Sequence, residues 1–324
     1  MELIQRARIQ AIFGGLIWLA FFWAPLETGP LRPIIMVLLL AILVIFPLGF
    51  SLANPYPTQH SAPIPFKVAL VLQPFAAIIV AASFLLPKGV MAGTLAIAWL
   101  PLTLFAAGHG FFQLREQGWR AALDHPAETC LAFAPIYLPI GAIWLLAARM
   151  GMEPLGFAEP IVSLTAVHFH YAGFAAPILC GLAGREIGNS ANHKSAITGT
   201  MYRIVAWIVI LGPALVAIGI TFSPLVEAIA GAVLAMGYTG LALITIGRLR
   251  QVNGILPRVF LGLSSLSAVV TMFAAAGFAL RTFNLFPFLS IPQMVAIHGW
   301  GNAIGFVLCG LLGWGLNQKS DTKR

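Results

Sequence analysis

Ten apolar segments, each long enough to cross a lipid bilayer, constrain the fold of this chain more than any other feature. An α-helix rises about 1.5 Å per residue, so about 20 apolar residues cross the roughly 30 Å of hydrocarbon in a membrane. The segments lie near residues 10–26, 32–52, 66–86, 90–112, 128–149, 160–181, 199–222, 224–247, 257–281 and 290–316. They predict an all-α fold, a polytopic integral membrane bundle of about ten transmembrane helices.

The composition and the connections agree with a single membrane-embedded domain. Hydrophobic residues make up 60% of the chain and charged residues 9%, whereas charged residues are about 25% of a typical soluble protein. The connections are short and rich in turn-forming residues, so we predict one transmembrane domain over residues 1–324. The sequence holds no Walker A loop and no GxSxG elbow, which argues against nucleotide hydrolysis and against a serine hydrolase.

The distribution of lysine and arginine predicts the orientation, because positively charged connections stay on the cytoplasmic side of a membrane. With a cytoplasmic N-terminus and ten spans, fourteen of the 18 basic residues fall on that side, and the other side holds Arg32, Lys88, Arg149 and Arg281. We therefore predict that both termini are cytoplasmic, and that the net charge of +8 attracts the protein to the anionic inner leaflet. No basic run interleaved with aromatic residues occurs in the sequence, so we expect no nucleic-acid partner.

Histidines interrupt two of the apolar segments. His168 and His170 lie in the segment 160–181, and His298 lies in the segment 290–316. A charged side chain at the bilayer centre costs about 2.5 kcal/mol or more, so such residues pair with protein groups and mark functional sites by default. Both segments run inward from the outer boundary in the predicted topology, which places His168 and His298 at the same depth, about 12 Å below it. We predict that these segments meet and form a histidine cluster in the outer half of the membrane.

The helical face around His298 is small and polar. Gly301, Asn302 and Gly305 share this face, three, four and seven residues further along the chain. The two glycines form a GxxxG pair, which lets a neighbouring backbone approach closely in a membrane helix. We therefore predict that this face points toward the protein interior.

The helical face around His168 carries further polar groups, namely Thr165 and Tyr171. Residues two positions apart on a helix point about 200° away from each other. For that reason we do not expect His168 and His170 to bind one ion together, and each of them should face a different neighbour.

Two stretches of the sequence carry a family resemblance. They read "LTAVHFHYAGFAAPIL" at residues 164–179 and "HGWGNAIGF" at residues 298–306. Both resemble the YndJ-like family of bacterial multi-pass membrane proteins, and the resemblance covers the sixth to tenth spans. It implies a location in the bacterial cytoplasmic membrane and assigns no reaction. The residues to which it directs attention are His168, His170, Tyr171, His298 and Asn302.

Three interpretations of the histidines are open. The working hypothesis is a haem or transition-metal site, because imidazole suits iron, copper and zinc, and the second ring nitrogen of a ligand needs its own partner. The candidate ligands are His168, His170 and His298, and the candidate pocket residues are Tyr171, Asn302 and Thr165. The alternative is a transporter or proton relay with the same histidines along the path of a small molecule or ion. The third interpretation is purely structural, with the histidines as contacts between helices.

Two residues are weaker candidates. His109 lies at the cytoplasmic end of the fourth segment, and we interpret it as a histidine at the membrane interface. Glu227 lies in the first turn of the eighth segment, where a carboxylate stabilises a helix N-terminus. The one enzyme class that the histidines could serve is a membrane-embedded oxidoreductase with a bound cofactor.

Overall fold

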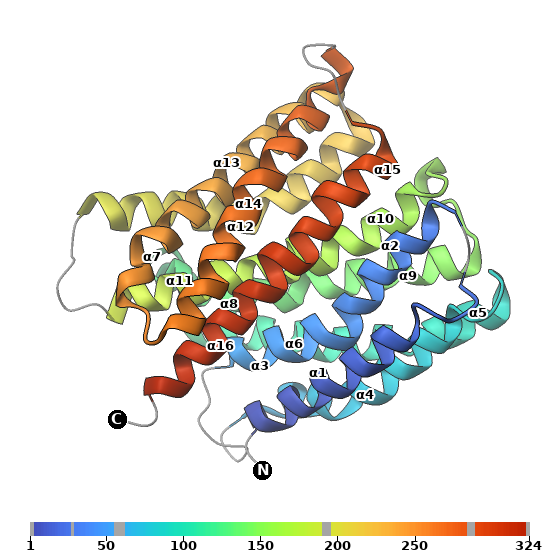
Figure 1. Ribbon diagram of the computed structural model, residues 1–324, viewed down its shortest axis with the longest axis horizontal. Helices are drawn as coiled ribbons and strands as arrows, with labels where there is room; N and C mark the ends of the chain where they lie inside the picture. Colours follow the sequence, from blue (N-terminus) through green and yellow to red (C-terminus); the bar gives the residue numbers. More distant parts are fainter. Residues whose placement is uncertain (1–2, 27–28, 55–61, 190–195, 284–288, 322–324) are drawn as a thin grey trace. The chain divides into compact units, whose positions relative to one another are not determined.

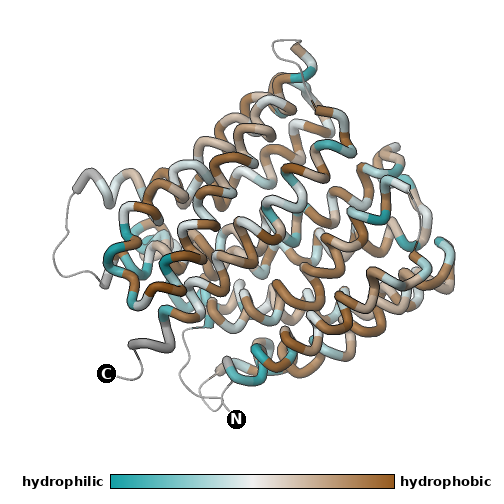
Figure 2. Tube along the Cα trace, viewed as in Figure 1, coloured by the Kyte–Doolittle hydropathy of each residue, from teal (hydrophilic) through white to brown (hydrophobic). Residues whose placement is uncertain are grey.

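The computed structural model describes residues 3–26, 29–54, 62–189, 196–283 and 289–321 (Figure 1). Its regular structure is helical throughout, and no strand occurs in these ranges. The helices carry mostly hydrophobic residues along their length, and many of the hydrophilic residues lie near helix ends (Figure 2). The predicted all-α membrane fold is therefore confirmed.

Within the described ranges, nine helical stretches are long and apolar enough to cross a membrane. They match the second to tenth predicted segments in order. Their bounds are Leu31–Ala53, Ile64–Ser83, Val90–Gln117, Pro126–Met150, Ile161–Gly188, Thr198–Phe222, Pro224–Gln251, Ile255–Ala279 and Ile291–Asn317.

The first predicted segment, 10–26, differs from the structure. The helix at this position, α1, covers Leu3–Ala20 and does not belong to the nine, because its first turns contain Arg6 and Arg8 and it ends at Ala20. Its outer face is nonetheless apolar, with Ile12 and Phe13 more than 60% exposed. We therefore keep the tenth crossing as a prediction.

The chain divides into two compact units, and the structure determines the fold of each by itself. Unit 1 comprises residues 1–119 and 132–175. Its elements are α1, α2 (Leu31–Leu40), η1 (Ala41–Ile45), α3 (Phe46–Ala53), α4 (Ile64–Ser83), α5 (Val90–Ala96), α6 (Trp99–Gln117), η2 (Ala134–Tyr137), α9 (Leu138–Met150), η3 (Pro154–Gly156), α10 (Ile161–His168) and η4 (Phe169–Ala175). Helix α1 packs against η1 and α3, and η4 contacts η1, η2 and α9 (Figure 1).

Unit 2 comprises residues 120–131 and 176–324. Its elements are most of α7 (Trp119–Asp124) and α8 (Pro126–Phe133), with α11 (Ala176–Asn189), α12 (Ala196–Phe222), α13 (Pro224–Arg248), η5 (Leu249–Gln251), α14 (Ile255–Ala279), η6 (Arg281–Phe283), α15 (Ile291–Met294), η7 (Val295–Gly299), η8 (Gly301–Leu308) and α16 (Cys309–Asp321). Helices α12, α13 and α14 pack in chain order, and α14 also lies along η7, η8 and α16 (Figure 1).

In the described part of the chain, four elements are π-helical, namely η1, η4, η7 and η8. A π-helix bonds each N–H to the carbonyl five residues earlier, is rare, and often marks a functional site. His170 lies in η4 and His298 lies in η7. The two spans are thus irregular at His170 and His298, whereas His168 is the last residue of the α-helix α10.

The orientation of the termini is a testable prediction. If α1 crosses the membrane, ten spans put both termini on the same side, which the distribution of basic residues predicts to be the cytoplasm, whereas nine spans would put the termini on opposite sides. We expect green fluorescent protein to fluoresce when it is fused to either end of this chain in a bacterial host, and alkaline phosphatase to stay inactive at either end. An active phosphatase fusion at the N-terminus alone would show that α1 does not cross.

Candidate functional site

His170 is buried in unit 1, with 1% of its surface exposed. Its Nδ1–H donates to the carbonyl of Ala166 at 2.7 Å, and its Nε2 accepts the indole N–H of Trp99 at 2.8 Å. A neutral imidazole has one donor and one acceptor nitrogen, so these two bonds satisfy both ring nitrogens of His170. In this arrangement Nε2 has already used its lone pair and is not placed to ligate a metal ion.

The close packing of α9 gives the His170 ring its position. A Cβ atom added to Gly141 of α9 would lie 2.7 Å from His170 Nδ1, so only glycine leaves room for the ring. On the other side, Trp99 is fully buried and meets Phe46 edge to face at 5.4 Å between ring centroids. Phe46 in turn stacks on Phe174 at 5.5 Å. His170 therefore belongs to the aromatic core of unit 1, which we call the Trp99 cluster (Trp99, His170, Phe46 and Phe174).

Tyr171 and a glutamine join the π-helical segments of unit 1 to their neighbours. The Tyr171 hydroxyl donates to the carbonyl of Val37 at 2.9 Å, and the Gln73 amide donates to the carbonyl of Ile42 in η1 at 3.1 Å. Backbone carbonyls in a bilayer core need partners within the protein, and side chains supply them where a helix is irregular. Tyr171 thus bonds through its hydroxyl to the backbone of the span Leu31–Ala53.

His168 and Thr165 differ from His170 in that both bond to their own helix. His168 is exposed in the structure, and its Nδ1–H donates to the carbonyl of Leu164 at 2.7 Å. The Thr165 hydroxyl donates to the carbonyl of Ile161 at 2.8 Å. The Nδ1–H bond fixes the tautomer of His168, so Nε2 is the acceptor nitrogen of the ring.

His298 lies half-buried in unit 2, against α14. Its Nδ1 lies 3.0 Å from the carbonyl of Thr271 and 3.2 Å from the amide nitrogen of Asn302. The Asn302 amide donates to the His298 carbonyl at 2.8 Å, while its oxygen accepts the Thr271 hydroxyl at 3.0 Å. His298, Asn302 and Thr271 therefore form one hydrogen-bonded group, in which Nδ1 donates to Thr271 in one tautomer of the ring and accepts from Asn302 in the other.

The predicted close approach at the GxxxG pair is confirmed. A Cβ atom on Gly301 would lie 2.5 Å from the Thr271 side chain, and one on Gly305 would overlap the hydroxyl of Ser267. The Ser267 hydroxyl donates to the carbonyl of Gly301 at 2.7 Å. Ser264 makes a similar bond to the carbonyl of Phe306 at 2.6 Å. Helix α14 thus supplies hydroxyl groups to the π-helical backbone of η8.

The predicted site residues fall into both units. His168, His170, Thr165 and Tyr171 belong to unit 1, whereas His298, Asn302 and Glu227 belong to unit 2. The predicted proximity of His168 and His298 therefore stays a prediction. Among the residues that the structure describes, no group of three or more histidine, cysteine, aspartate or glutamate side chains is placed to hold a metal ion.

The two weaker candidates have partners that the sequence did not indicate. His109 is 3% exposed and lies beside the stacked rings of Phe50 and Phe66, at 5.8 and 5.1 Å between centroids. It is a buried residue of unit 1, and its position at the membrane interface stays a prediction. Glu227 lies in the first turn of α13, as expected, and also forms an ion pair with Arg281 at 2.6 Å.

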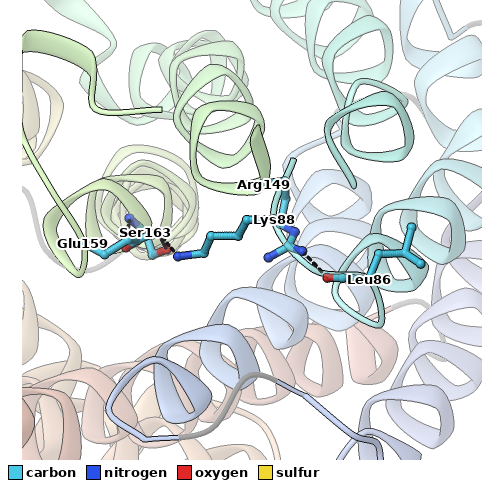
Figure 3. Close-up of polar contacts among 5 residues, drawn as sticks. All are labelled: Leu86, Lys88, Arg149, Glu159 and Ser163. Atoms are coloured by element: carbon cyan, nitrogen blue, oxygen red, sulfur yellow. Dashed lines mark hydrogen bonds and ion pairs between the residues drawn. The ribbon is translucent and has the colours of Figure 1, made fainter. Parts of the chain in front are cut away.

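Sequence reasoning missed a polar cluster in unit 1, drawn in Figure 3. Arg149 is 2% exposed and donates to the carbonyls of Ser83 and Leu86 at 2.9 and 2.7 Å. Beside it, Lys88 pairs with Glu159 at 3.2 Å, and Glu159 accepts the Ser163 hydroxyl at 2.8 Å (Figure 3). Lys88 and Arg149 are two of the four basic residues on the predicted outer side, where lysine and arginine are otherwise scarce. Their presence there was the sequence feature that could have indicated this cluster.

Comparisons with known proteins agree with a membrane protein of many spans. A protein-family profile described as "YndJ-like protein" matches residues 36–306. A curated relative from Bacillus subtilis (strain 168), named "Uncharacterized membrane protein YndJ", is 32% identical over 223 residues. This alignment covers 68% of the present chain and 38% of the relative, so the chain spans less than half the length of that protein. No solved structure matches the chain.

Proposed function

The chain belongs to the YndJ-like family of multi-pass membrane proteins, and from that premise we propose that it is a transport protein that moves protons across the bacterial cytoplasmic membrane. His298 takes up and releases the proton in this proposal. The observation that carries it is the position of His298 in a π-helical interruption of the span Ile291–Asn317. Ionisable side chains within membrane spans mark ion paths and proton relays.

The interruptions of the spans support transport over a purely structural role for the histidines. The span Ile161–Gly188 contains η4, and the span Ile291–Asn317 contains η7 and η8. Transporters place their ion sites where membrane helices depart from regular α-helix, because backbone and side-chain groups there become available to an ion. Mid-helix π-segments are likewise concentrated at functional sites.

The bonding of His298 suits the uptake of a proton. In the neutral ring Nδ1 either donates to the Thr271 carbonyl or accepts from the Asn302 amide. In the imidazolium both ring nitrogens carry a proton, and Nδ1–H donates to the Thr271 carbonyl. The protein therefore offers the charged ring an acceptor at Nδ1. An ordinary histidine changes its charge between pH 5 and 8, which is the range that a physiological proton carrier needs.

His170 has a different part in this proposal. Protonation of its Nε2 would break the bond from Trp99, so His170 serves the packing of the Trp99 cluster and carries no proton. The three candidate histidines thus divide into a structural residue, His170, and two residues, His168 and His298, that remain candidates for the proton path.

A second candidate function is haem or transition-metal ligation at His168 or His298. The observation in its favour is that Nδ1 of each ring lies within hydrogen-bond distance of a backbone carbonyl, since a ligating histidine almost always donates its other ring N–H to such a group. A Soret band, or stoichiometric iron, copper or zinc, in the detergent-purified protein that disappears in the His298→Ala variant would favour ligation.

Proton transport can be measured directly in proteoliposomes that contain the trapped pH indicator pyranine. A potassium gradient with valinomycin makes the interior negative and drives protons inward. We expect the wild-type protein to acidify the interior faster than protein-free vesicles do, and the His298→Gln variant to reduce the rate to the protein-free value, because glutamine hydrogen-bonds without accepting a proton.

The matched control is His125→Gln, which removes an exposed histidine in the connection between α7 and α8 and should keep the wild-type rate. Acidification by the wild-type protein that is no faster than in protein-free vesicles would refute proton transport. If the wild type and His298→Gln acidify the interior at equal rates, both above that of protein-free vesicles, the protein transports protons and His298 is not the carrier.

A further inference from the structure

The turn between α13 and α14 concentrates positive charge at the end of unit 2. Residues 247–258 contain Arg248, Arg250 and Arg258 and neither aspartate nor glutamate. Arg250 and Arg258 are exposed, whereas Arg248 is 7% exposed and donates to the Gln251 side chain at 2.9 Å. Two guanidinium groups thus face outward from a short turn that has no acidic residue of its own.

The turn is held in one conformation. Val252 at its centre is 1% exposed, and its carbonyl accepts Arg258 Nε–H at 2.9 Å. The backbone N–H of Asn253 donates to the side chain of Asn317 in α16 at 3.0 Å. The backbone of the turn accepts two of the five N–H donors of Arg258, one through Nε and one through Nη2. A guanidinium held in this way can offer its other donors to an anion in a defined orientation.

Exposed apolar side chains lie beside these arginines. Ile246 precedes the turn with 43% of its surface exposed, and Ile255, Leu256 and Val259 in the first turns of α14 are 74%, 54% and 48% exposed. An acyl chain can cover such a surface while an arginine contacts the phosphate of the same lipid. A free phosphate ion would leave the apolar part uncovered.

We propose that the α13–α14 turn is a binding site for one anionic phospholipid, whose phosphate contacts Arg250 and Arg258 and whose acyl chains cover Ile255 and Leu256. Arginine suits a phosphate group because its planar donors match two oxygens at once. The proposal does not depend on proton transport. It specifies where unit 2 meets the anionic leaflet that the overall charge of the chain predicts.

The test is a titration of the detergent-solubilised protein with phosphatidylglycerol, followed by thermal unfolding. We expect phosphatidylglycerol to raise the melting temperature, and phosphatidylcholine to have a smaller effect at the same concentration. Each basic residue at an anionic surface contributes about fivefold in affinity, so the double variant R250Q/R258Q should bind phosphatidylglycerol about 30-fold more weakly. Loss of the Arg258 side chain also removes its bonds to the backbone of the turn. The single variant R250Q leaves those bonds in place, and we expect it to bind phosphatidylglycerol about fivefold more weakly than the wild type.

The matched control is the double variant R115Q/R120Q, which removes the same charge from exposed positions near the C-terminal end of α6 and in α7. It should keep the wild-type affinity, because Glu116 and Asp124 lie close by in the chain. Equal affinities of R250Q and the wild type would overturn the proposal. So would a stabilisation by inorganic phosphate alone as large as that by phosphatidylglycerol, since a free anion would then be the ligand.

Discussion

Replacing Trp99 by alanine is expected to lower the free energy of unfolding by about 3–5 kcal/mol, the usual cost of removing a buried tryptophan. Trp99 is fully buried, it meets Phe46 edge to face, and its indole N–H is the donor to His170 Nε2. The loss combines a cavity with an unsatisfied imidazole nitrogen in the core of unit 1. The measurement is chemical unfolding of the purified protein in mixed micelles.

The Trp99→Phe variant separates the hydrogen bond from the packing. It keeps an aromatic ring and removes the donor, and a buried acceptor left unsatisfied costs about 1–3 kcal/mol. In the His170→Leu background the same change should cost less, because the acceptor is then absent, and a double-mutant cycle gives the coupling between the two residues. Trp119→Phe is the control, since Trp119 is 71% exposed. A coupling free energy of zero would show that the hydrogen bond between Trp99 and His170 does not contribute to stability. His170 would then become a candidate for a functional role again.

Hydropathy alone was sufficient to predict where the long apolar helices lie, because the cost of burying polar residues in lipid acts on each segment separately. The eighth predicted segment, 224–247, corresponds to the helical stretch Pro224–Gln251, and the tenth, 290–316, to Ile291–Asn317. Only the first segment is ambiguous. The first turns of its helix, α1, contain Arg6 and Arg8. These two arginines lower the mean hydropathy of the helix below that of a membrane span.

The π-helical segments could not be predicted, because residues far away in the chain stabilise them. Tyr171 of η4 bonds through its hydroxyl to the Val37 carbonyl, 134 residues away, and Ser267 bonds to the Gly301 carbonyl of η8, 34 residues away. No periodicity within one segment contains that information. The small face at Gly301 was predictable, because helix geometry places its neighbours on the same side and small residues allow close packing.

Charge counting singled out the four basic residues on the predicted outer side without indicating their bonds. Arg149 was one of four exceptions in the orientation argument, and the structure shows it buried, with its guanidinium donating to the carbonyls of Ser83 and Leu86 and lying 4.8 Å from the ring centroid of Phe84. A cation near the C-terminal end of a helix stabilises carbonyls that have no partner in the helix itself. The sequence reveals the charge of such a residue, whereas its partners depend on how α4 and α9 pack.

Replacing Gly14 by valine is expected to lower the free energy of unfolding by about 1–3 kcal/mol or more, the cost of forcing extra atoms into a packed interior. A Cβ atom on Gly14 would overlap the backbone carbonyl oxygen of Leu43 in η1. A backbone oxygen cannot rotate away as a side chain can, so α1 must separate from η1 to accommodate the new group. The measurement is again chemical unfolding in mixed micelles.

The matched control is the next residue. A Cβ atom on Gly15 would meet only the Val44 side chain, at 4.0 Å, which is ordinary van der Waals contact. Gly15→Val makes the same change in composition and in helix propensity on the same turn of α1, so any difference between the two variants reports the contact between α1 and η1. Equal unfolding free energies for the two variants would show that α1 does not pack on η1, and the case for α1 as a tenth membrane span would lose its structural support.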